Sequence, residues 1–429
     1  MSNNKLKTII FLGAGFSAPA KFPIQKGIIS EMLSPPNKNI LSEEPALETE
    51  KFYKAFITVG IFLLENYTSI NSEKYKKEYR KIEHNLSLRK IGENFFRKVQ
   101  KNKKISHILS SDKYLENYIS KYFKLTDVDE TMQLSDLKEK IRCDLENEKI
   151  DVDLEELFTK FDKCVKNQTN WNQYSYRELD VINHSILQLF VFYFGRKDMS
   201  FSLNEDYKSF GEFVKQENVA IITTNWDTIC EQILKDKKIN YFCPNEITGI
   251  KKATRKKCVN IVKVHGSINW FTCLNCGKLQ IKPLKEEANF LLQDNKRFCK
   301  NCKSEESDDY LYVPEIITPT MIKSFDRRIY SNIWQSAENL LKNASRVIFV
   351  GYSLPPADFE LKYMLTKYIP KNIDIDVVLY NDCIKKDNLI EVPEDRYRRS
   401  FPKNKLSFTY AGFTEYFNEL NQKNKEQAQ

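Results

Sequence analysis

At 429 residues the chain can bury a substantial core and form more than one domain of ordinary size, which excludes a single small module. Hydrophobic residues make up 41% of the chain and aromatic residues 13%, which excludes an intrinsically disordered protein. The formal net charge of +9 is modest for this length and favours an anionic ligand, a nucleic acid or an acidic partner subunit, without choosing among them.

The first predicted element is an apolar strand over residues 8–12. It enters a turn that reads Gly13-Ala14-Gly15-Phe16-Ser17-Ala18 and fits the Gly-x-Gly-x-x-Ala form of a dinucleotide fingerprint. Glycine permits a tight turn and lets backbone N–H groups approach a pyrophosphate, whose charge is favoured at the N-terminus of a following helix. The hydroxyl of Ser17 can also donate to a phosphate. The alternative is a glycine turn that only reverses the chain.

The N-terminal run has some features of a secretory signal, because Lys5 and Lys7 precede it and Ala18-Pro19-Ala20 resembles a cleavage site. The run is short and contains two glycines, which favours a strand that enters a turn. Six of the ten cysteines are scattered without pattern, as in proteins of a reducing compartment. No apolar stretch approaches the about 20 residues that a bilayer span needs. We therefore expect a soluble, cytoplasmic protein without a membrane partner.

Residues 28–211 contain no convincing parallel strand and are rich in Lys, Glu, Leu, Tyr and Phe. They predict a large insertion of amphipathic helices after the first strand. Within it, residues 73–104 are strongly basic with interleaved aromatic residues, a composition that can contact nucleic acid. A solvated helix face with buried aromatic side chains is the simpler interpretation. Three of the four histidines lie in this insertion without partner motifs.

Beyond the insertion, short apolar runs alternate with helical patterns. The predicted strands cover 219–224, 261–264, 346–350, 375–380 and 406–409, and the helices include 228–234, 332–341 and 358–368. Continuous apolar strands suit a parallel sheet that is buried on both faces, and the alternation predicts a doubly wound α/β fold. Ligands of such sheets bind at the carboxyl ends of the strands.

Polar motifs follow two of these strands. Thr224-Asn225-Trp226-Asp227 ends the strand at 219–224, and His265-Gly266 ends the strand at 261–264. An amide can donate and accept hydrogen bonds, and a fixed carboxylate can stabilise developing positive charge. Near pH 7 a histidine can accept a proton at little cost. The alternatives are that Asn225 and Asp227 only cap the next helix, and that His265 is structural.

Four cysteines form two Cys-x-x-Cys knuckles, Cys273 with Cys276 and Cys299 with Cys302, separated by 22 residues. This spacing predicts a structural zinc site. Four thiolates complete a tetrahedral Zn²⁺ and leave no position for water, so the metal would fold the module without taking part in catalysis. A pair of redox-active dithiols is the alternative.

Two further motifs follow the later strands. Gly351-Tyr352-Ser353-Leu354 ends the strand at 346–350, and Asp358 beyond it is a candidate cap for the next helix. Asn381 follows the strand at 375–380, where a capped turn is an equally simple interpretation.

In this order the motifs resemble the sirtuin family, whose members cleave the nicotinamide–ribose bond of NAD. The resemblance covers about half of the chain and implies a Rossmann-like core with NAD as substrate. It implies that Asn225 holds the nicotinamide ribose, that Asp227 binds the carboxamide and that His265 is the catalytic base. It also implies that the remaining NAD contacts come from Gly13, Ala14, Gly15, Ser17, Thr224, Gly351, Ser353 and Asn381.

Two departures from the sirtuin pattern narrow the function. Only Phe22-Pro23 remains of the Gly-Ile-Pro-Asp-Phe-Arg segment. The Phe-Gly-Glu segment that pairs with an acyl-lysine peptide is replaced by 314–320, which reads Pro-Glu-Ile-Ile-Thr-Pro-Thr. Cleavage machinery without a peptide platform favours water as the acceptor, and so an NAD glycohydrolase.

The large insertion resembles those of bacterial sirtuin-like effectors that deplete NAD on phage infection. Such an enzyme would be held inactive by its homo-oligomeric state or by a partner, such as a DNA-translocating ATPase, until it is released, for example by a phage-derived trigger. An NAD-dependent protein-lysine deacylase is one alternative, and a non-catalytic module that binds NAD or ADP-ribose is another.

The predicted organisation has six segments. They are 1–27 (start of the Rossmann-like core), 28–211 (helical insertion), 212–268 (core), 269–312 (zinc ribbon), 313–420 (core) and 421–429 (disordered tail).

Overall fold

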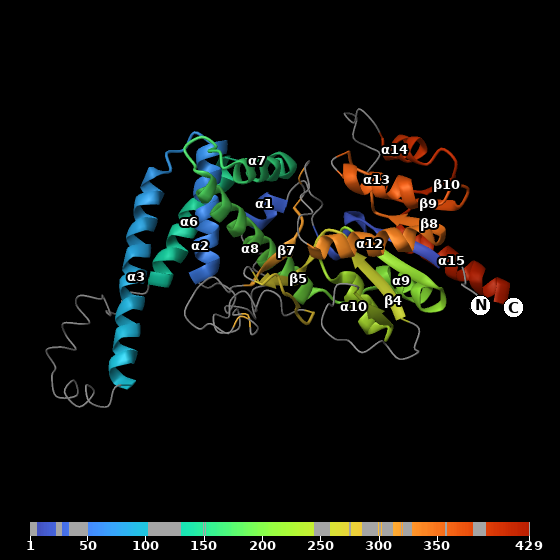
Figure 1. Ribbon diagram of the computed structural model, residues 1–429, viewed down its shortest axis with the longest axis horizontal. Helices are drawn as coiled ribbons and strands as arrows, with labels where there is room; N and C mark the ends of the chain where they lie inside the picture. Colours follow the sequence, from blue (N-terminus) through green and yellow to red (C-terminus); the bar gives the residue numbers. More distant parts are fainter. Residues whose placement is uncertain are drawn as a thin grey trace. The chain divides into compact units, whose positions relative to one another are not determined.

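The computed structural model describes residues 7–22, 28–33, 50–101, 130–148, 150, 152–243, 258–273, 276–284, 299, 302, 312–318, 320, 328–356, 358–380 and 392–428. The chain divides into two compact units (Figure 1). The first comprises Met1–Met32, Asp153–Asn183 and Phe190–Gln429, and the second comprises Leu33–Val152 and His184–Leu189.

The first unit is built on a parallel sheet whose described strands have the order β10-β9-β8-β1-β2-β4-β3. The strands are β1 Lys7–Leu12, β2 Val219–Thr223, β3 Asn240–Phe242, β4 Cys258–Lys263, β8 Ala344–Val350, β9 Asp374–Val378 and β10 Lys405–Thr409. Each strand predicted from an apolar run is present in this sheet, and β3 is the one described strand of the sheet that was not predicted. The doubly wound parallel sheet is therefore confirmed.

The chain leaves β1 toward β2 on one side, and later leaves β8 toward β9 on the other. The direction of winding therefore reverses between β1 and β8, which are hydrogen-bonded neighbours. Doubly wound sheets bind their ligands at the carboxyl ends of the strands beside such a switch point.

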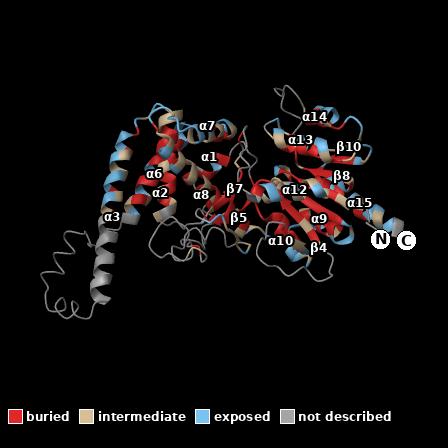
Figure 2. Ribbon diagram, in the orientation of Figure 1, coloured by how far each residue is buried: buried red, intermediate tan, exposed pale blue. Residues whose placement is uncertain are grey.

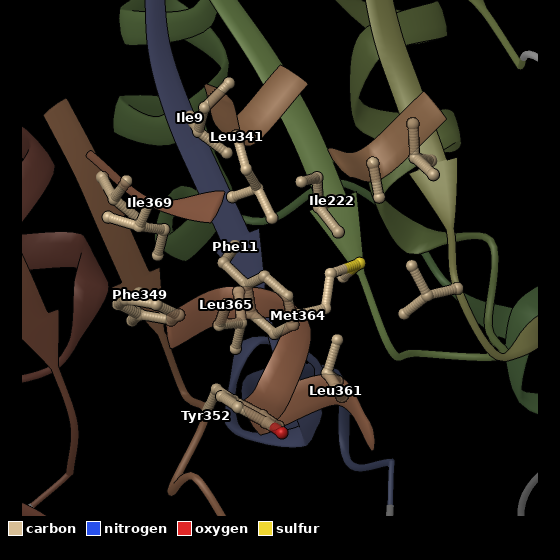
Figure 3. Packing of buried hydrophobic residues seen from close by; sticks show 14 of the residues in the cluster. Ile9, Phe11, Ile222, Leu341, Phe349, Tyr352, Leu361, Met364, Leu365 and Ile369 are labelled. Atoms are coloured by element: carbon tan, nitrogen blue, oxygen red, sulfur yellow. The ribbon is translucent and has the colours of Figure 1, made fainter. Parts of the chain in front are cut away.

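One face of the sheet packs against α12 Arg328–Lys342, α13 Phe359–Tyr368 and α14 Pro393–Ser400. Burial of this core removes apolar side chains of both layers from water, which is the main driving force for the fold. Figure 3 shows part of it, and Figure 2 shows the buried strands. The labelled residues are Ile9, Phe11, Ile222, Leu341, Phe349, Tyr352, Leu361, Met364, Leu365 and Ile369.

Residues of the opposite pleat meet α10 Ile229–Asp236 and α15 Phe413–Ala428. Arg346 on β8 donates to Asp376 on β9 over 2.7 Å and to the hydroxyl of Tyr416 on α15 over 3.2 Å. Helix α9 Glu205–Gln216 packs on α15 through Phe210 and Phe417, whose ring centroids are 5.3 Å apart. The sheet is thus covered on both faces, which is why its inner strands β1 and β2 are almost entirely apolar.

The polar tail after residue 420, predicted to be disordered, is helical as far as Ala428. Asn421 is only 5% exposed and donates to the backbone oxygen of Ser209 over 2.9 Å, and Asn424 donates to Glu217 over 3.0 Å. The prediction was wrong because these amide side chains find polar partners in and after α9.

A second, antiparallel sheet follows β4 and carries cysteines of the zinc module. Its strands are β5 Gly266–Cys273, β6 Leu279–Ile281 and β7 Tyr312–Ile316, in the order β6-β5-β7. All residues of β5 are buried, including its polar ones. None of these three strands was predicted as a strand.

The chain between β1 and β2 is helical in its described parts, as predicted. Helices α1 Ile28–Leu33, α7 Leu154–Asn167 and α8 Tyr176–Ser200 precede α9, and α2 Glu50–Tyr67, α3 Glu73–Lys101 and α6 Glu130–Glu148 belong to the second unit. In the basic helix α3, Tyr75 is buried, so this aromatic side chain packs internally. No helix of the described ranges is long and apolar enough to cross a membrane.

Candidate active site at the carboxyl ends of the strands

The loops after β1 and β8 interlock at the switch point. The N–H of Gly13 donates to Val350 over 2.9 Å, and the N–H of Gly15 donates to the oxygen of Gly351 over 2.9 Å. Gly351 has a φ of +62°, and a Cβ there would lie 2.4 Å from the nitrogen of Phe16. Glycine is required here both for its backbone conformation and for the close approach of the two loops.

The turn after β1 opens into two 3₁₀ turns, Ala14–Phe16 and Ala18–Ala20, and not into an α-helix. The predicted helix N-terminus directly after the glycines is therefore absent. Ala14 is exposed, whereas Ser17 is buried. Any anion held by this turn would depend on its backbone N–H groups and not on the dipole of a following α-helix.

Ser17, Asn225 and Asp227 form one hydrogen-bonded cluster. The hydroxyl of Ser17 donates to Oδ2 of Asp227 over 2.7 Å. Nδ2 of Asn225 donates to the hydroxyl oxygen of Ser17 and to the backbone oxygen of Gly13, both over 3.0 Å. The hydroxyl hydrogen of Ser17 therefore points to Asp227. This cluster joins the loop after β2 to the loop after β1.

Asp227 is buried, and burial raises the pKa of its carboxyl group despite its stabilising neighbours. Oδ1 accepts from the N–H of Ile229 over 3.1 Å, so the residue also serves the turn into α10, as the capping interpretation expected. Lys263 lies beneath it, with its ammonium 2.5 Å from the backbone oxygen of Asp227 and 2.9 Å from Glu231. Lys263 is fully buried, and its two acidic neighbours raise its pKa although burial alone would lower it.

Other contacts of the loop after β2 fix the backbone around the cluster. The N–H of Thr224 donates to the oxygen of Leu12 over 3.1 Å. The ring of Trp226 stacks on Phe190 of α8 with centroids 5.6 Å apart. Thr228 donates its hydroxyl hydrogen to the buried Asp198, also on α8. The loop is therefore held by β1 on one side and by α8 on the other.

His265 is only 8% exposed and lies two residues after the end of β4, in the turn that leads into β5. Its backbone oxygen accepts from the N–H of Ile317 over 2.8 Å. Gly266 has a φ of +77°, and a Cβ there would lie 2.2 Å from the oxygen of Glu315 on β7. Gly266 is thus required by the backbone as well as by the motif, since a Cβ at this first position of β5 would collide with β7.

The imidazole of His265 faces a carboxylate. Its Nε2 lies 3.9 Å from Oδ1 of Asp358, and the hydroxyl of Tyr352 donates to Oδ2 of the same carboxylate over 2.9 Å. Asp358 stands immediately before α13, as expected for a cap, but its side chain makes no capping hydrogen bond. The prediction that the Asp358 side chain caps α13 is therefore wrong.

The downstream loop is held by α14. Arg396 donates through Nε to the backbone oxygen of Ser353 over 3.1 Å, and Tyr397 donates to the oxygen of Tyr352 over 2.8 Å. Burial lowers the pKa of Arg396. Asn381, predicted to lie near the adenosine ribose, is outside the described residues.

The four cysteines of the predicted zinc site come together. Their sulfurs all lie within 4.8 Å of one another, with Cys273 and Cys302 3.9 Å apart and Cys276 and Cys299 3.6 Å apart. A tetrahedral zinc with Zn–S bonds of about 2.3 Å places its sulfurs about 3.8 Å apart, so the cluster fits Zn²⁺. None of the described cysteines is disulfide-bonded.

The structure thus groups the sequence-predicted residues in two places on one edge of the sheet. Ser17, Asn225 and Asp227 form the first group, and His265 belongs to the second with Asp358. Sequence reasoning missed Lys263, Tyr352 and Arg396 as parts of the site. The signal for Lys263 was a single charged residue in an apolar strand, two positions before His265.

This arrangement defines a doubly wound α/β protein with glycine loops at its switch point and a four-cysteine module inserted after the turn that carries His265. Residues 219–374 match a family model described as a SIR2-like domain. The matched segment runs from β2 to the start of β9 and includes Asn225, Asp227, His265 and the four cysteines.

Several solved sirtuin structures overlap with the chain weakly. A structure of Sir2 with p53 peptide and NAD⁺ has 15% identity and a TM-score of 0.34, covering 62% of this chain and 90% of that chain. Sir2Tm bound to a propionylated peptide has 17% identity and a TM-score of 0.30, covering 52% of this chain and 71% of that chain. These overlaps are too weak to bear on function. Comparison with curated proteins gave no match.

Proposed function

We propose that the protein is a sirtuin-like NAD glycohydrolase that cleaves NAD to nicotinamide and ADP-ribose. The observation that carries the proposal is the cluster of Ser17, Asn225 and Asp227 at the same edge of the sheet as His265, within and beside a SIR2-like domain. A fixed carboxylate and amide dipoles can stabilise the positive charge that develops on a ribose as its glycosidic bond breaks.

In the proposed reaction the bond between ribose C1′ and nicotinamide breaks, and its electron pair leaves with nicotinamide. Water adds at C1′ and loses a proton, first to His265 and then to solvent. Asn225 orients the ribose. Asp227 binds the carboxamide, and because Ser17 and the N–H of Ile229 already occupy one lone pair on each of its oxygens, the carboxamide would use a remaining one.

Gly13, Ala14, Gly15, Thr224, Gly351 and Ser353 would line the rest of the NAD site, and Zn²⁺ on the four cysteines would stabilise the antiparallel sheet. We further propose that the enzyme is an NAD-depleting anti-phage effector. A homo-oligomer or a partner such as a DNA-translocating ATPase would hold it inactive, because uncontrolled loss of NAD would kill the cell.

Burial of β7 favours hydrolysis over protein deacylation. A peptide acceptor would need an open strand edge to pair with. Pro314, Glu315 and Ile316 are all buried, and Pro314 has no N–H to offer a partner strand. Water requires no such platform.

The first experiment is NAD consumption by the purified protein, with the products separated by chromatography. We expect nicotinamide and ADP-ribose from the parent, and a loss of about 100-fold or more in His265→Ala and Asn225→Ala. His84→Ala is the matched control, because His84 is an exposed residue of α3, and it should retain full activity.

Two results would contradict the proposal. Turnover that requires an acetylated peptide, with release of acetylated ADP-ribose, would identify a deacylase. A binding module would be identified if the parent and His265→Ala bound NAD equally well and the parent did not cleave it. The parent would be tested for cleavage in its oligomeric form and together with any partner that purifies with it.

A further inference from the structure

Asp358 and His265 form a pair that the resemblance to sirtuins does not supply. The Nε2–Oδ1 distance is 3.9 Å, and the two side chains are only 10% and 14% exposed. An opposite charge within about 4–6 Å favours the charged form of a titratable group, and partial burial weakens screening by salt. The carboxylate is therefore close enough to act on the imidazole electrostatically, without a direct hydrogen bond.

Tyr352 fixes the direction of this carboxylate. Burial, and secondarily the nearby Asp358, raises the pKa of Tyr352 well above its usual value. The phenol therefore stays protonated and donates a hydrogen bond to Oδ2 of Asp358. The other oxygen, Oδ1, is then the one directed at His265. The ring itself is locked by packing on Phe11, with centroids 4.7 Å apart.

The position of Asp358 makes this arrangement informative. An aspartate before a helix ordinarily accepts hydrogen bonds from the first N–H groups of that helix, and the side chain of Asp358 does not. The Asp358 carboxylate instead accepts a hydrogen bond from Tyr352 and lies close to His265, which indicates a role in the site.

Other charged residues lie on the elements next to His265. Lys263 precedes it on β4 and is paired with Glu231 of α10, while Asp227 after β2 accepts from Ser17 and from the N–H of Ile229. Glu315 lies on β7, where it pairs with Ser267 in the antiparallel ladder. Asp358 differs from these groups in that its Oδ1 is placed 3.9 Å from Nε2 of the imidazole.

We propose that Asp358, held by Tyr352, is a positioning residue that orients His265 and sets the pH range over which its imidazole accepts a proton. The catalytic part of this proposal rests on the proposed function. The electrostatic coupling between Asp358 and His265 is a property of the protein without NAD. The carboxylate keeps Nε2 directed into the site and stabilises the imidazolium that forms when the imidazole takes a proton from water.

The test is the NMR titration of the histidine side chains in the protein without NAD. The chain has four histidines, so the His265 signal is identified by its loss in His265→Ala. In Asp358→Asn, which keeps the size of the side chain and its ability to cap, we expect the His265 titration midpoint to move about 1 pH unit lower. Tyr352→Phe should move it in the same direction by less, because the ring packing remains while the hydrogen bond is lost.

Activity gives the second readout. In Asp358→Asn the maximal rate of NAD cleavage should fall between ~10-fold and ~100-fold with the NAD dissociation constant unchanged, and the acid limb of the pH–rate profile should move lower with the NMR midpoint. Asp395→Asn, at an exposed position in the first turn of α14, is the control and should leave both readouts unchanged.

The outcomes separate the two proposals. An unchanged His265 midpoint in both Asp358→Asn and Tyr352→Phe would overturn the role of Asp358, whether or not the protein cleaves NAD. A shifted midpoint in a protein that does not cleave NAD would support the coupling and count against the glycohydrolase. Should Asp358→Asn fail to fold, Tyr352→Phe decides alone.

Discussion

Asp227 experiences opposing influences on its carboxyl group. Burial disfavours the charged form, while the Lys263 ammonium, the Ser17 hydroxyl and the N–H of Ile229 favour it. Burial has the larger effect, so the pKa of Asp227 is raised. A group with a raised acidic pKa in the folded protein binds its proton more tightly there than in the unfolded chain.

Stability should therefore depend on pH through this residue. As the pH rises from about 4, the usual value for an aspartate in an unfolded chain, toward the folded pKa, ionisation of Asp227 lowers the free energy of unfolding by up to ~1.4 kcal/mol per pH unit. Asp227→Asn cannot ionise. We expect its stability relative to the parent to increase with pH over this window and to level off above it, in urea unfolding at a series of pH values.

Asp395→Asn, which changes an exposed aspartate of α14, is the control variant for this experiment. If the advantage of Asp227→Asn instead shrank as the pH rose, Lys263 and Ser17 would outweigh burial and the raised pKa would be wrong. Activity would be lost in Asp227→Asn in either case under the proposed mechanism.

At the scale of elements, two glycines with similar backbone conformations can be compared. The comparison separates the stability lost through a steric collision between the interlocked loops from the stability lost through a left-handed backbone alone. Gly351 and Gly277 have φ values of +62° and +66°, but a Cβ at Gly277 would meet nothing within 4 Å. Gly277→Ala should cost only about 1 kcal/mol, for the left-handed backbone. Gly351→Ala should cost about 3 kcal/mol or more, since the Cβ also collides with the backbone of Gly15 and Phe16.

Denaturant unfolding of the two variants measures this difference. Gly351→Ala should also weaken NAD binding, because the displaced loop carries part of the proposed site. Similar stabilities for the two variants would mean that the loops after β1 and β8 separate easily, and the switch point would then be less rigid than its contacts indicate.

The antiparallel sheet depends on its cysteines. We expect one zinc per chain by mass spectrometry of metals, lost in Cys299→Ser and retained in Cys143→Ser, which changes an exposed cysteine outside the cluster. Removal of zinc by a strong chelator should lower the thermal unfolding midpoint by roughly 5 °C or more, because metal binding stabilises the folded module. Purified protein that is fully folded without metal would contradict the zinc assignment.

The elements that the sequence predicted correctly are those whose signal is local. Strands β1 and β2 and the second half of β8 are continuous apolar runs because the sheet is buried on both faces there. The edge strand β10 has no buried residue and alternates apolar with polar residues. Strand β5 escaped prediction because Ser267, Asn269 and Thr272 interrupt it, and these polar residues are buried through contacts with segments distant in the chain. Asn269, for example, donates to the backbone oxygen of Lys282 on the far side of the first knuckle.

The same distinction applies to the site. Motifs at strand ends located Asn225, Asp227 and His265, since the carboxyl ends of parallel strands share one edge. The partners of these residues could not be predicted, because each pair joins different elements: Lys263 with Glu231 of α10, and His265 with Asp358 before α13. A contact between side chains on different elements leaves no pattern in the local sequence.

At the scale of the whole molecule, the first unit is assembled from parts of the chain that lie far apart. The helical chain between β1 and β2 separates two neighbouring strands by about half of the sequence, and its described parts contribute to both compact units. Only after β8 can the switch point form.

The central position of β1 has a consequence for how the protein is made. Its hydrogen-bonding partners are distant: Thr223 bonds Leu12 across 211 residues, and Ser345 bonds Lys7 across 338. During synthesis this apolar strand therefore emerges long before either neighbour exists: one edge stays unpaired until β2 has been made, and the other until β8 has been made. Long-range parallel pairing is intrinsically slow and exposes unpaired strand edges to aggregation. The nascent chain should therefore depend on chaperones until β8 is synthesised, and production of the protein should be limited by folding more than by the stability of the finished sheet.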